Sequence, residues 1–563
     1  MFNAAVFGIL GAVWFIVMYK WYGGIIERRL ISADDTLSTP AEAQRDNVDY
    51  VPSNPAILFG HHFSSIAGAG PIVGPMLAYS LFGWLPAILW VLLGSVFIGA
   101  VHDYVSLMVS VRNRGVSIAV LAQTYVSKRA RWIFSIFLWL ALVLVIAVFS
   151  VLTAQTLVEK PAIVLPTFGL IVLALIFGFL VFRRNLNLWV GTISAIIVII
   201  GLIILGSYFP IQASFEFWLI VVLLYSFVAS TIPVWMLLQP RDYLSMYILI
   251  SGLALAFVSL LVLQPSINGP AFLSETSSHV PLWPMLFITV ACGAVSGFHS
   301  VVASGTSAKQ LRRESDGRIV AFGGMLTEAF LAMVVILLIS SVLFWREAPL
   351  PELAGYIYGD LLRQQGVNIT FGTALGKAME SIGVPIQYGI AFGVLMLNAF
   401  ILTTLDTCSR LSRYVLSETI GQKVPFLKNM YLSTGAGLVI AYFLTMGNSW
   451  RILWPVFGAA NQLIAALSLL VVSAYVFGYK KSTRYTLIPG VFMLVTTEGA
   501  LIYQLLWQYI PEGNMILSIL TAVLMVLGII IAIEVYQRMR KEIMRDGAPI
   551  SRVHEASPPE NTG

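Results

Sequence analysis

Long apolar stretches separated by short polar connections run through almost the whole of this chain. A bilayer core about 30 Å thick is spanned by roughly 20 apolar residues in a helix. Fifteen stretches of about this length can be marked off, and we expect each to be a transmembrane helix. They fall at residues 2–22, 57–80, 84–110, 132–154, 162–182, 186–208, 215–238, 243–263, 282–304, 318–344, 384–406, 430–446, 451–477, 485–508 and 515–537.

The composition agrees with a chain that lies mostly in lipid. Of its 563 residues, 58% are hydrophobic and only 11% are charged, whereas about 25% are charged in a soluble globular protein. The first apolar stretch lacks the basic start and the small-residue exit of a cleaved signal peptide, so we expect it to remain as a helix. The sequence therefore predicts an all-α polytopic membrane protein.

The positive charges alternate between the two sides of these predicted helices. Alternate connections, starting with the one after the first stretch and ending with the C-terminal tail, together hold 28 of the 33 Lys and Arg residues. The positive-inside rule places these connections in the cytoplasm of a bacterial or archaeal inner membrane. The N-terminus is then outside, and residues 541–563 form a cytoplasmic tail whose Pro-rich end is predicted to be disordered. Because the basic residues do not form one patch, a nucleic-acid partner is excluded.

The second stretch, residues 57–80, is predicted to be a broken helix. Five glycines and prolines fall between Gly68 and Pro75, and each proline leaves a carbonyl without its helical donor. In a bilayer, irregular backbone survives only around a cavity or inside protein. One interpretation is a proline kink packed against a neighbour; the other is a substrate site. The substrate residues predicted here are Ser64, Ser65, Gly68, Gly70 and Pro71.

A second interruption lies in the seventh stretch, where Pro233 follows Ser230 and Thr231, and these three residues are also predicted to bind substrate. Each interrupted helix is the first of five consecutive predicted helices. Because five is odd, the two groups cross the membrane in opposite orientations. This is the LeuT-type 5+5 inverted repeat, with broken first and sixth core helices and additional scaffold helices. The predicted segments are an N-terminal helix and linker (1–56), a transport core (57–410) and C-terminal scaffold helices (411–540).

Several ionisable residues fall inside the apolar stretches. A charge at the helix centre costs roughly 2.5–3.5 kcal/mol on insertion scales, so each needs a reason to be there. Either these groups make buried structural hydrogen bonds or they couple transport to protons, a role that suits histidine. The predicted coupling residues are His61, His62, His102, Asp103, His299, Glu328 and Asp406.

Glu328 is placed nearest the middle of its stretch and has the best claim to the coupling role. Asp406 and Arg410 are spaced four apart and are expected to form an ion pair on one helix face. Hydroxyl residues at 296–306 could instead bind sodium, and the residues leave the choice between protons and sodium open.

Motifs of enzymes are missing from the sequence. We find no Ser-His-Asp arrangement, no H-E-x-x-H and no Gly-rich phosphate loop, and therefore expect no catalytic residues and no cofactor. The two cysteines, Cys292 and Cys408, lie in or beside apolar stretches, which argues against a disulfide framework or a metal site. A channel or sensor without concentrative transport remains an alternative to a transporter.

Eight segments of the chain resemble the carbon starvation protein A family. They are 59–63 (FGHHF), 67–75 (AGAGPIVGP), 101–104 (VHDY), 237–243 (LLQPRDY), 296–300 (SGFHS), 323–328 (GGMLTE), 402–410 (LTTLDTCSR) and 453–462 (LWPVFGAANQ). The resemblance covers most of the chain in the family's order. It implies an importer of pyruvate or small peptides driven by the proton-motive force, within the amino acid/polyamine/cation superfamily. It leaves the choice between pyruvate and peptides open.

Overall fold

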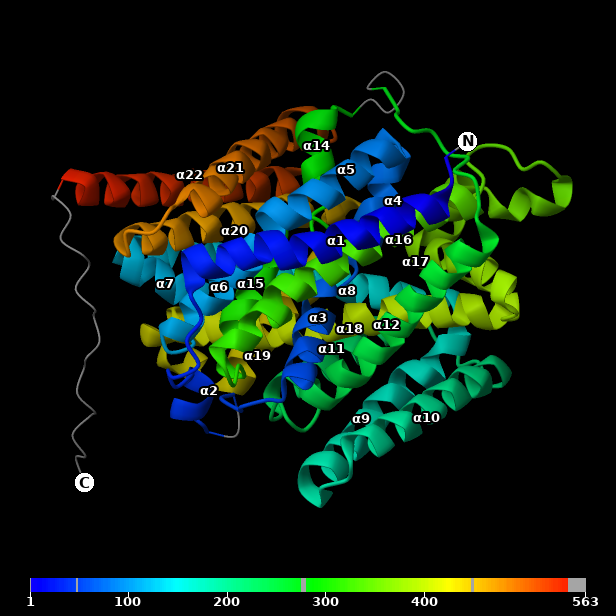
Figure 1. Cartoon of the computed structure of the whole chain (residues 1–563), viewed down its shortest axis with the longest axis horizontal. Helices are drawn as coiled ribbons and strands as arrows, with labels where there is room; N and C mark the ends of the chain where they lie inside the picture. The colour runs from blue at the N-terminus through cyan, green and yellow to red at the C-terminus, as the bar shows by residue number, and fades with distance from the viewer. Residues whose placement is uncertain (1, 47–48, 275–279, 447–449, 545–563) are drawn as a thin grey trace.

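The computed structural model describes residues 2–46, 49–274, 280–446 and 450–544. These residues form helices and contain no named strand, only two isolated bridge pairs (Figure 1). The first helices are α1 Ala4–Ile26, α2 Pro40–Ala43, α3 Pro55–Ala67, α4 Gly70–Phe82, α5 Trp84–Gly94, α6 Ala100–Arg112, α7 Ile118–Tyr125, α8 Lys128–Glu159, α9 Val164–Arg184, α10 Leu188–Tyr208, α11 Phe215–Thr231 and α12 Leu238–Leu263. The later ones are α14 Leu282–Thr289, α15 Gly297–Gly305, α16 Gly324–Val342, α17 Tyr358–Met379, α18 Ile386–Glu418, α19 Met430–Thr445, α20 Trp450–Gly478, α21 Arg484–Gln504 and α22 Met515–Met544.

Shorter helical segments join or extend these helices. The π-helical segments are η1 Glu27–Ile31, η2 Ser95–Gly99, η6 Arg318–Gly323 and η11 Leu505–Tyr509. The 3-10 turns are η3 Pro161–Ile163, η4 Ser307–Lys309, η5 Glu314–Asp316, η7 Pro351–Tyr356, η8 Glu380–Ile382, η9 Ile420–Gln422 and η10 Pro425–Lys428. The predicted disordered end of the tail lies outside the described residues.

Twelve helical spans of the described residues are long and apolar enough to cross a membrane. The predicted stretches 215–238 and 430–446 become the shorter apolar helices α11 and α19, and 282–304 is split into α14 and α15. The predicted count of fifteen complete spans is therefore not confirmed. The chain is nevertheless a multi-pass membrane protein.

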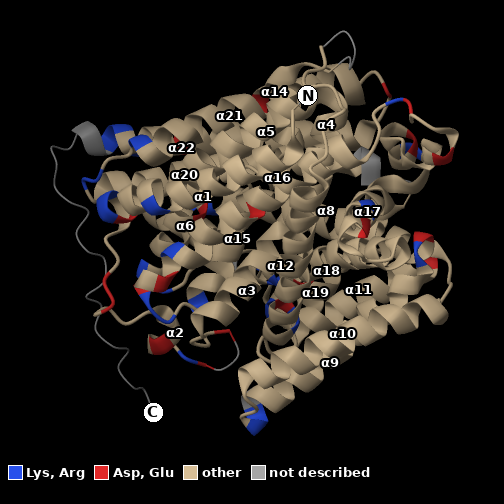
Figure 2. Cartoon of the chain, turned by 45° about the vertical axis from the view of Figure 1, so that its right-hand side comes forward, with Lys and Arg blue, Asp and Glu red and all other residues tan. Residues whose placement is uncertain are grey.

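The burial of the spans separates a centre from a periphery. The apolar part of α20 is entirely buried, and those of α8 and α18 are mostly buried, whereas only 28% of those of α10 and α22 is buried. The α9–α10 hairpin lies at one side of the bundle (Figure 1). Most charged residues lie at helix ends and in connections (Figure 2), as expected for helix shafts that face lipid.

Candidate functional site

The first broken helix is interrupted where the sequence predicted it. Asn54 caps the start of α3, and Pro55 occupies the first turn, where its missing N–H costs nothing. The helix stops at Gly68, whose φ of +49° is in the region that favours glycine. The chain becomes helical again at Gly70, so Pro71 and Pro75 belong to α4. The break is thus shorter than the predicted 68–75.

The break faces α18 and α8. Thr404 of α18 donates its hydroxyl to the Ser65 carbonyl at 2.9 Å, which satisfies an acceptor released at the helix end. A Cβ built on Gly68 would lie 3.0 Å from Thr404 Oγ1 and 3.2 Å from the ring of Phe149. Ser65 Oγ is also 3.2 Å from Thr407 Oγ1. Hydroxyls and an aromatic ring therefore pack closely against the break.

A second break lies in the ninth stretch, which the sequence predicted to be one continuous helix. Residues 290–296 separate α14 from α15 and are buried. A Cβ on Gly70 would lie 2.2 Å from the Cβ of Cys292, and one on Gly74 would lie 2.7 Å from the carbonyl oxygen of Thr289. The start of α4 is therefore in close contact with Cys292 of the second break and with the end of α14, and glycine is what permits it.

The residues around Pro233 lie elsewhere. The helix α11 ends at Thr231, a turn follows, and α12 starts at Leu238. Ser230 contacts Thr434 of α19 at 3.2 Å, and the Thr231 hydroxyl bonds to carbonyls of its own helix. The interruption at Pro233 is thus a connection between two helices, and Ser230, Thr231 and Pro233 do not join the other predicted substrate residues.

Two amides of α20 hold the second break, and sequence reasoning did not single them out. Asn461 Oδ1 accepts from the Phe298 backbone N–H at 2.8 Å, and its Nδ2 donates to Ser296 Oγ at 3.0 Å. Gln462 Nε2 donates to the carbonyls of Ala291 and Val295 at 3.4 and 2.8 Å. The available signal was a polar pair inside an apolar stretch, where each amide needs a partner.

Four of the predicted coupling residues form one buried cluster beside the breaks, which we call the histidine–carboxylate cluster: His102, Asp103, His299 and Glu328. The two carboxylate oxygens of Asp103 contact Nδ1 of His102 at 2.7 Å and Nδ1 of His299 at 2.8 Å. His299 Nε2 lies 3.2 Å from Glu328 Oε2, close enough for an ion pair but not aligned for a hydrogen bond. All four side chains have zero exposure.

Two further side chains border this cluster. His62 is bonded through Nδ1 to Ser307 Oγ at 2.8 Å, and its ring lies 3.2 Å from a Cβ built on Gly324, one turn before Glu328. The Sγ of Cys292 and the ligand atoms of His299 and Glu328 all lie within 4.8 Å of one another, close enough to share one ion. The sequence prediction of no metal site is untested.

The remaining predicted coupling residues, His61 and Asp406, belong to a second buried group that we call the arginine network: Tyr225, Arg241, Asp242 and Asp406, with His61 at its edge. His61 Nδ1 contacts Asp242 Oδ2 at 2.6 Å. Arg241 pairs with Asp242 at 3.0 Å and with Asp406. The Ser64 hydroxyl donates to the Asp242 carbonyl at 3.0 Å, which ties α3 to α12.

The predicted Asp406–Arg410 pair is wrong. Asp406 instead pairs with Arg241 and accepts from the Tyr225 hydroxyl at 2.6 Å. Arg410 donates to the carbonyls of Ala229 and Ile232. The Ala229 carbonyl is the one that Pro233 leaves free, so a guanidinium, and not a substrate, satisfies it.

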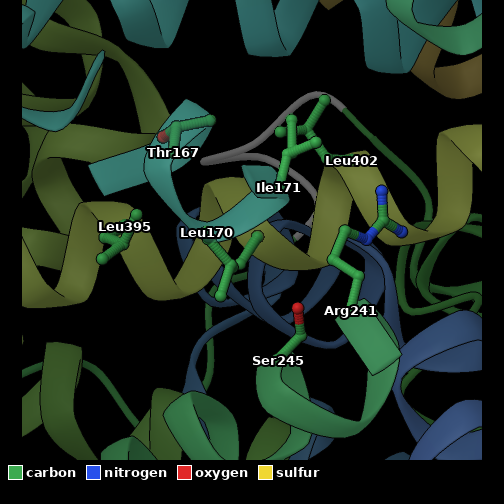
Figure 3. Close-up of a pocket in the computed structure, with 8 residues that line it drawn as sticks. Thr167, Leu170, Ile171, Arg241, Ser245, Leu395 and Leu402 are labelled. Carbon is green, nitrogen blue, oxygen red and sulfur yellow. The ribbon is translucent and has the colours of Figure 1, made fainter. Parts of the chain in front are cut away.

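A small cavity borders the arginine network between α9, α12 and α18, with about 10 Å³ of space, enough for about one water molecule. The Ser245 hydroxyl points into it below Arg241 (Figure 3). Arg241 Nε and Ser245 Oγ have no hydrogen-bond partner among the described residues. A larger cavity of about 390 Å³, between α4, α14, α17 and α20, reaches Thr289 at the second break. It is large enough for a small solute.

The contact between the breaks leads to a mutational prediction. Gly70→Ala should reduce uptake at least tenfold, because overpacking a dense core costs about 1–3 kcal/mol and here it separates the two breaks. Uptake into proteoliposomes at equal protein density measures this.

Gly70→Ala combined with Cys292→Gly should recover most of the activity, since the clashing Cβ is removed. Gly359→Ala, at a position with no atom within 4 Å, is the control and should be neutral; an active Gly70→Ala would contradict the close contact.

The chain is similar to known membrane transporters. The sequence profile described as carbon starvation protein CstA matches residues 3–348 and 348–500. The peptide transporter CstA of Bacillus subtilis is 31% identical, over 94% of this chain and 96% of that protein. The pyruvate/proton symporter BtsT of Escherichia coli is 32% identical, over 86% of this chain and 80% of that protein.

One solved structure shows the fold at a greater distance. The Eremococcus coleocola manganese transporter, in complex with an aromatic bis-isothiourea compound, aligns with a TM-score of 0.50 at 11% identity, over 88% of this chain and 99% of that one. This likeness concerns the arrangement of helices alone.

Proposed function

Since the chain belongs to the carbon starvation protein CstA family, we propose that it is a secondary active transporter that imports pyruvate or small peptides by proton symport with alternating access. Its relatives carry the names of a peptide transporter and a pyruvate/proton symporter. The observation that supports the mechanism best is the pair of breaks in contact beside a buried cluster of two carboxylates and two imidazoles.

The proposed substrate site lies between Gly68–Pro71 and the segment 290–296. Both helices are interrupted there, and broken helices of transporters bind substrates in this way. Phe149 and Thr404 would supply an apolar and a hydroxyl wall, and the 390 Å³ cavity that reaches Thr289 would be the outer approach. Ser64 and Ser65 remain part of the proposal; Ser230, Thr231 and Pro233 do not.

The two breaks suggest a revised inverted repeat. The first group of five would be α3–α4, α5–α6, α8, α11 and α12, and the second α14–α15, α16, α18, α19 and α20. The first member of each group is broken, and the third members are the long helices α8 and α18, of 32 and 33 residues, which pack against each other. The α9–α10 hairpin would be inserted, α1, α21 and α22 would be scaffold, and the core would extend to residue 478.

The geometry of the histidine–carboxylate cluster favours protons. His299 lies between Asp103 at Nδ1 and Glu328 at Nε2. A neutral imidazole has one N–H, so only one of the two ring nitrogens of His299 can donate. At the other nitrogen, two hydrogen-bond acceptors would face each other unless the cluster holds an extra proton. No Lys or Arg is paired with either carboxylate among the described residues. Proton uptake therefore gives the two facing acceptors a proton to share. It also neutralises negative charge, and uncompensated charge is costly in a bilayer.

Sodium coupling is the second candidate, supported by the hydroxyls of Ser65, Thr404 and Thr407 at the first break. The proposed orientation, with the N-terminus outside and the C-terminus in the cytoplasm of a bacterial inner membrane, comes from the distribution of Lys and Arg.

The experiment that tests the function uses purified protein in proteoliposomes. Labelled pyruvate, with unlabelled di- and tripeptides as competitors, is supplied under an inward pH gradient or an inward sodium gradient, with a chelator present throughout. We expect accumulation above equilibrium under the pH gradient alone. Accumulation with sodium alone would overturn proton symport, and downhill flux under every gradient would overturn active transport.

A further inference from the structure

An apolar groove of about 400 Å³ opens on the outer surface of the bundle, between α1, α3 and the segment formed by η6 and the start of α16. It is lined by Ala12, Phe15, Ile16, Tyr19, Phe59, Ile319, Gly323, Leu326, Thr327 and Phe330. Ile16 and Ile319 are about half exposed. The Thr327 hydroxyl donates to the Gly323 carbonyl of its own helix at 2.9 Å, so it is not free to bind another group. The walls therefore suit a hydrocarbon chain.

The length of the groove fits one leaflet of a bilayer. Its wall on η6 and α16 runs from Ile319 to Phe330, which corresponds to about 16 Å at a rise of 1.5 Å per residue. Half of a hydrocarbon core is about 15 Å. The groove can therefore accept an acyl chain along its whole depth within one leaflet.

Positive charge gathers at one end of the groove. Arg318 lies over the ring of Tyr19, 5.1 Å from its centroid, and is paired with Glu27 at 2.5 Å. Lys20, which is exposed, follows Tyr19 along α1. The exposed Lys20 adds a cation to the Arg318–Glu27 pair, and this end is on the side that the positive-inside rule assigns to the cytoplasm. Anionic headgroups are attracted to such clusters.

We propose that this groove is a binding site for one anionic phospholipid of the cytoplasmic leaflet, with an acyl chain between α1 and α16 and its phosphate beside Arg318. Phe59 connects the site to the broken helix, because it lies on α3 and stacks on Phe63 at 5.7 Å between centroids. The lipid would thus contact the half-helix that carries His61 and His62. The binding claim does not depend on which ion drives transport.

Native mass spectrometry of the purified full chain tests the site, with phosphatidylglycerol or phosphatidylcholine added to delipidated protein. Gly323→Leu should fill the groove, since a Cβ there would lie 3.6 Å from the Tyr19 ring without a clash. The matched control is Gly201→Leu on α10, where no atom lies within 4 Å. We expect one retained phosphatidylglycerol in the wild type and in Gly201→Leu, and at least tenfold lower occupancy in Gly323→Leu.

Arg318→Gln tests the headgroup separately. It should retain a lipid but lose the preference for phosphatidylglycerol over phosphatidylcholine. The proposal is overturned if the wild type retains no lipid, if Gly323→Leu retains as much as Gly201→Leu, or if Arg318→Gln keeps the wild-type preference. If Gly323→Leu fails to fold, as judged by size-exclusion chromatography, Thr327→Leu fills the same groove from the next turn and takes its place.

Discussion

Glu328→Gln should abolish the accumulation of substrate driven by a pH gradient, with a loss of at least tenfold, while exchange of labelled for unlabelled substrate continues within about twofold of the wild type. Glutamine has the shape of the protonated acid but cannot release a proton. The fully buried Glu328 carboxyl has no hydrogen bond among the described residues, so the substitution removes little besides titration and the charge contact with His299. Net uptake and exchange, measured in the same proteoliposomes, separate the loss of coupling from the loss of substrate binding.

The matched control for this prediction is Glu498→Gln. Its carboxyl oxygens are also buried without a hydrogen-bond partner, but it belongs to α21, outside the proposed repeats. Uptake by this variant should keep the wild-type dependence on the pH gradient. If Glu328→Gln also kept that dependence, Glu328 would not be the coupling residue, and another member of the histidine–carboxylate cluster would have to be tested.

Arg241→Met should destabilise the protein by about 3–5 kcal/mol, because it leaves the buried carboxylates of Asp242 and Asp406 without their cation. Both carboxylates have zero exposure. The free energy of unfolding, measured by denaturant titration in detergent micelles, gives the size of the effect. Adding Asp406→Asn to Arg241→Met should recover at least half of the loss, because replacing both members of a buried pair is often nearly neutral.

An exposed ion pair provides the control for this second prediction. Arg363 pairs with Asp360 on α17, with 76% and 43% of their side chains exposed, and pairs of this kind contribute about 0–1 kcal/mol. Arg363→Met should therefore change stability by less than about 1 kcal/mol. An equal effect of the two arginine substitutions would mean that the arginine network does not hold α12 and α18 together.

The sequence was sufficient for properties that arise from local chemistry and from lipid. Apolar length predicted the twelve long apolar spans, because a backbone in hydrocarbon must satisfy its own hydrogen bonds. The glycines and prolines after Ala67 predicted the first break, and the structure confirms it at Gly68. The family resemblance is confirmed as well.

The second break was missed for an identifiable reason. Segment 290–296 has a single glycine and no proline, so no local rule marks it, whereas Pro233 attracted the prediction to a place where a helix simply ends. The segment is held open by contacts from Asn461 and Gln462, more than 160 positions later in the chain. Propensities of neighbouring residues contain no information about such partners.

The tertiary structure alone decided which buried charges meet. From spacing, Asp406 was assigned to Arg410 on its own helix, but packing brings it to Arg241, 165 positions away. Packing likewise places His299 between Asp103 and Glu328. The sequence by itself determined that ionisable groups are inside the membrane, since their cost follows from composition and position. Their partners depend on which helix faces lie together, and that is fixed by the packing of the whole bundle.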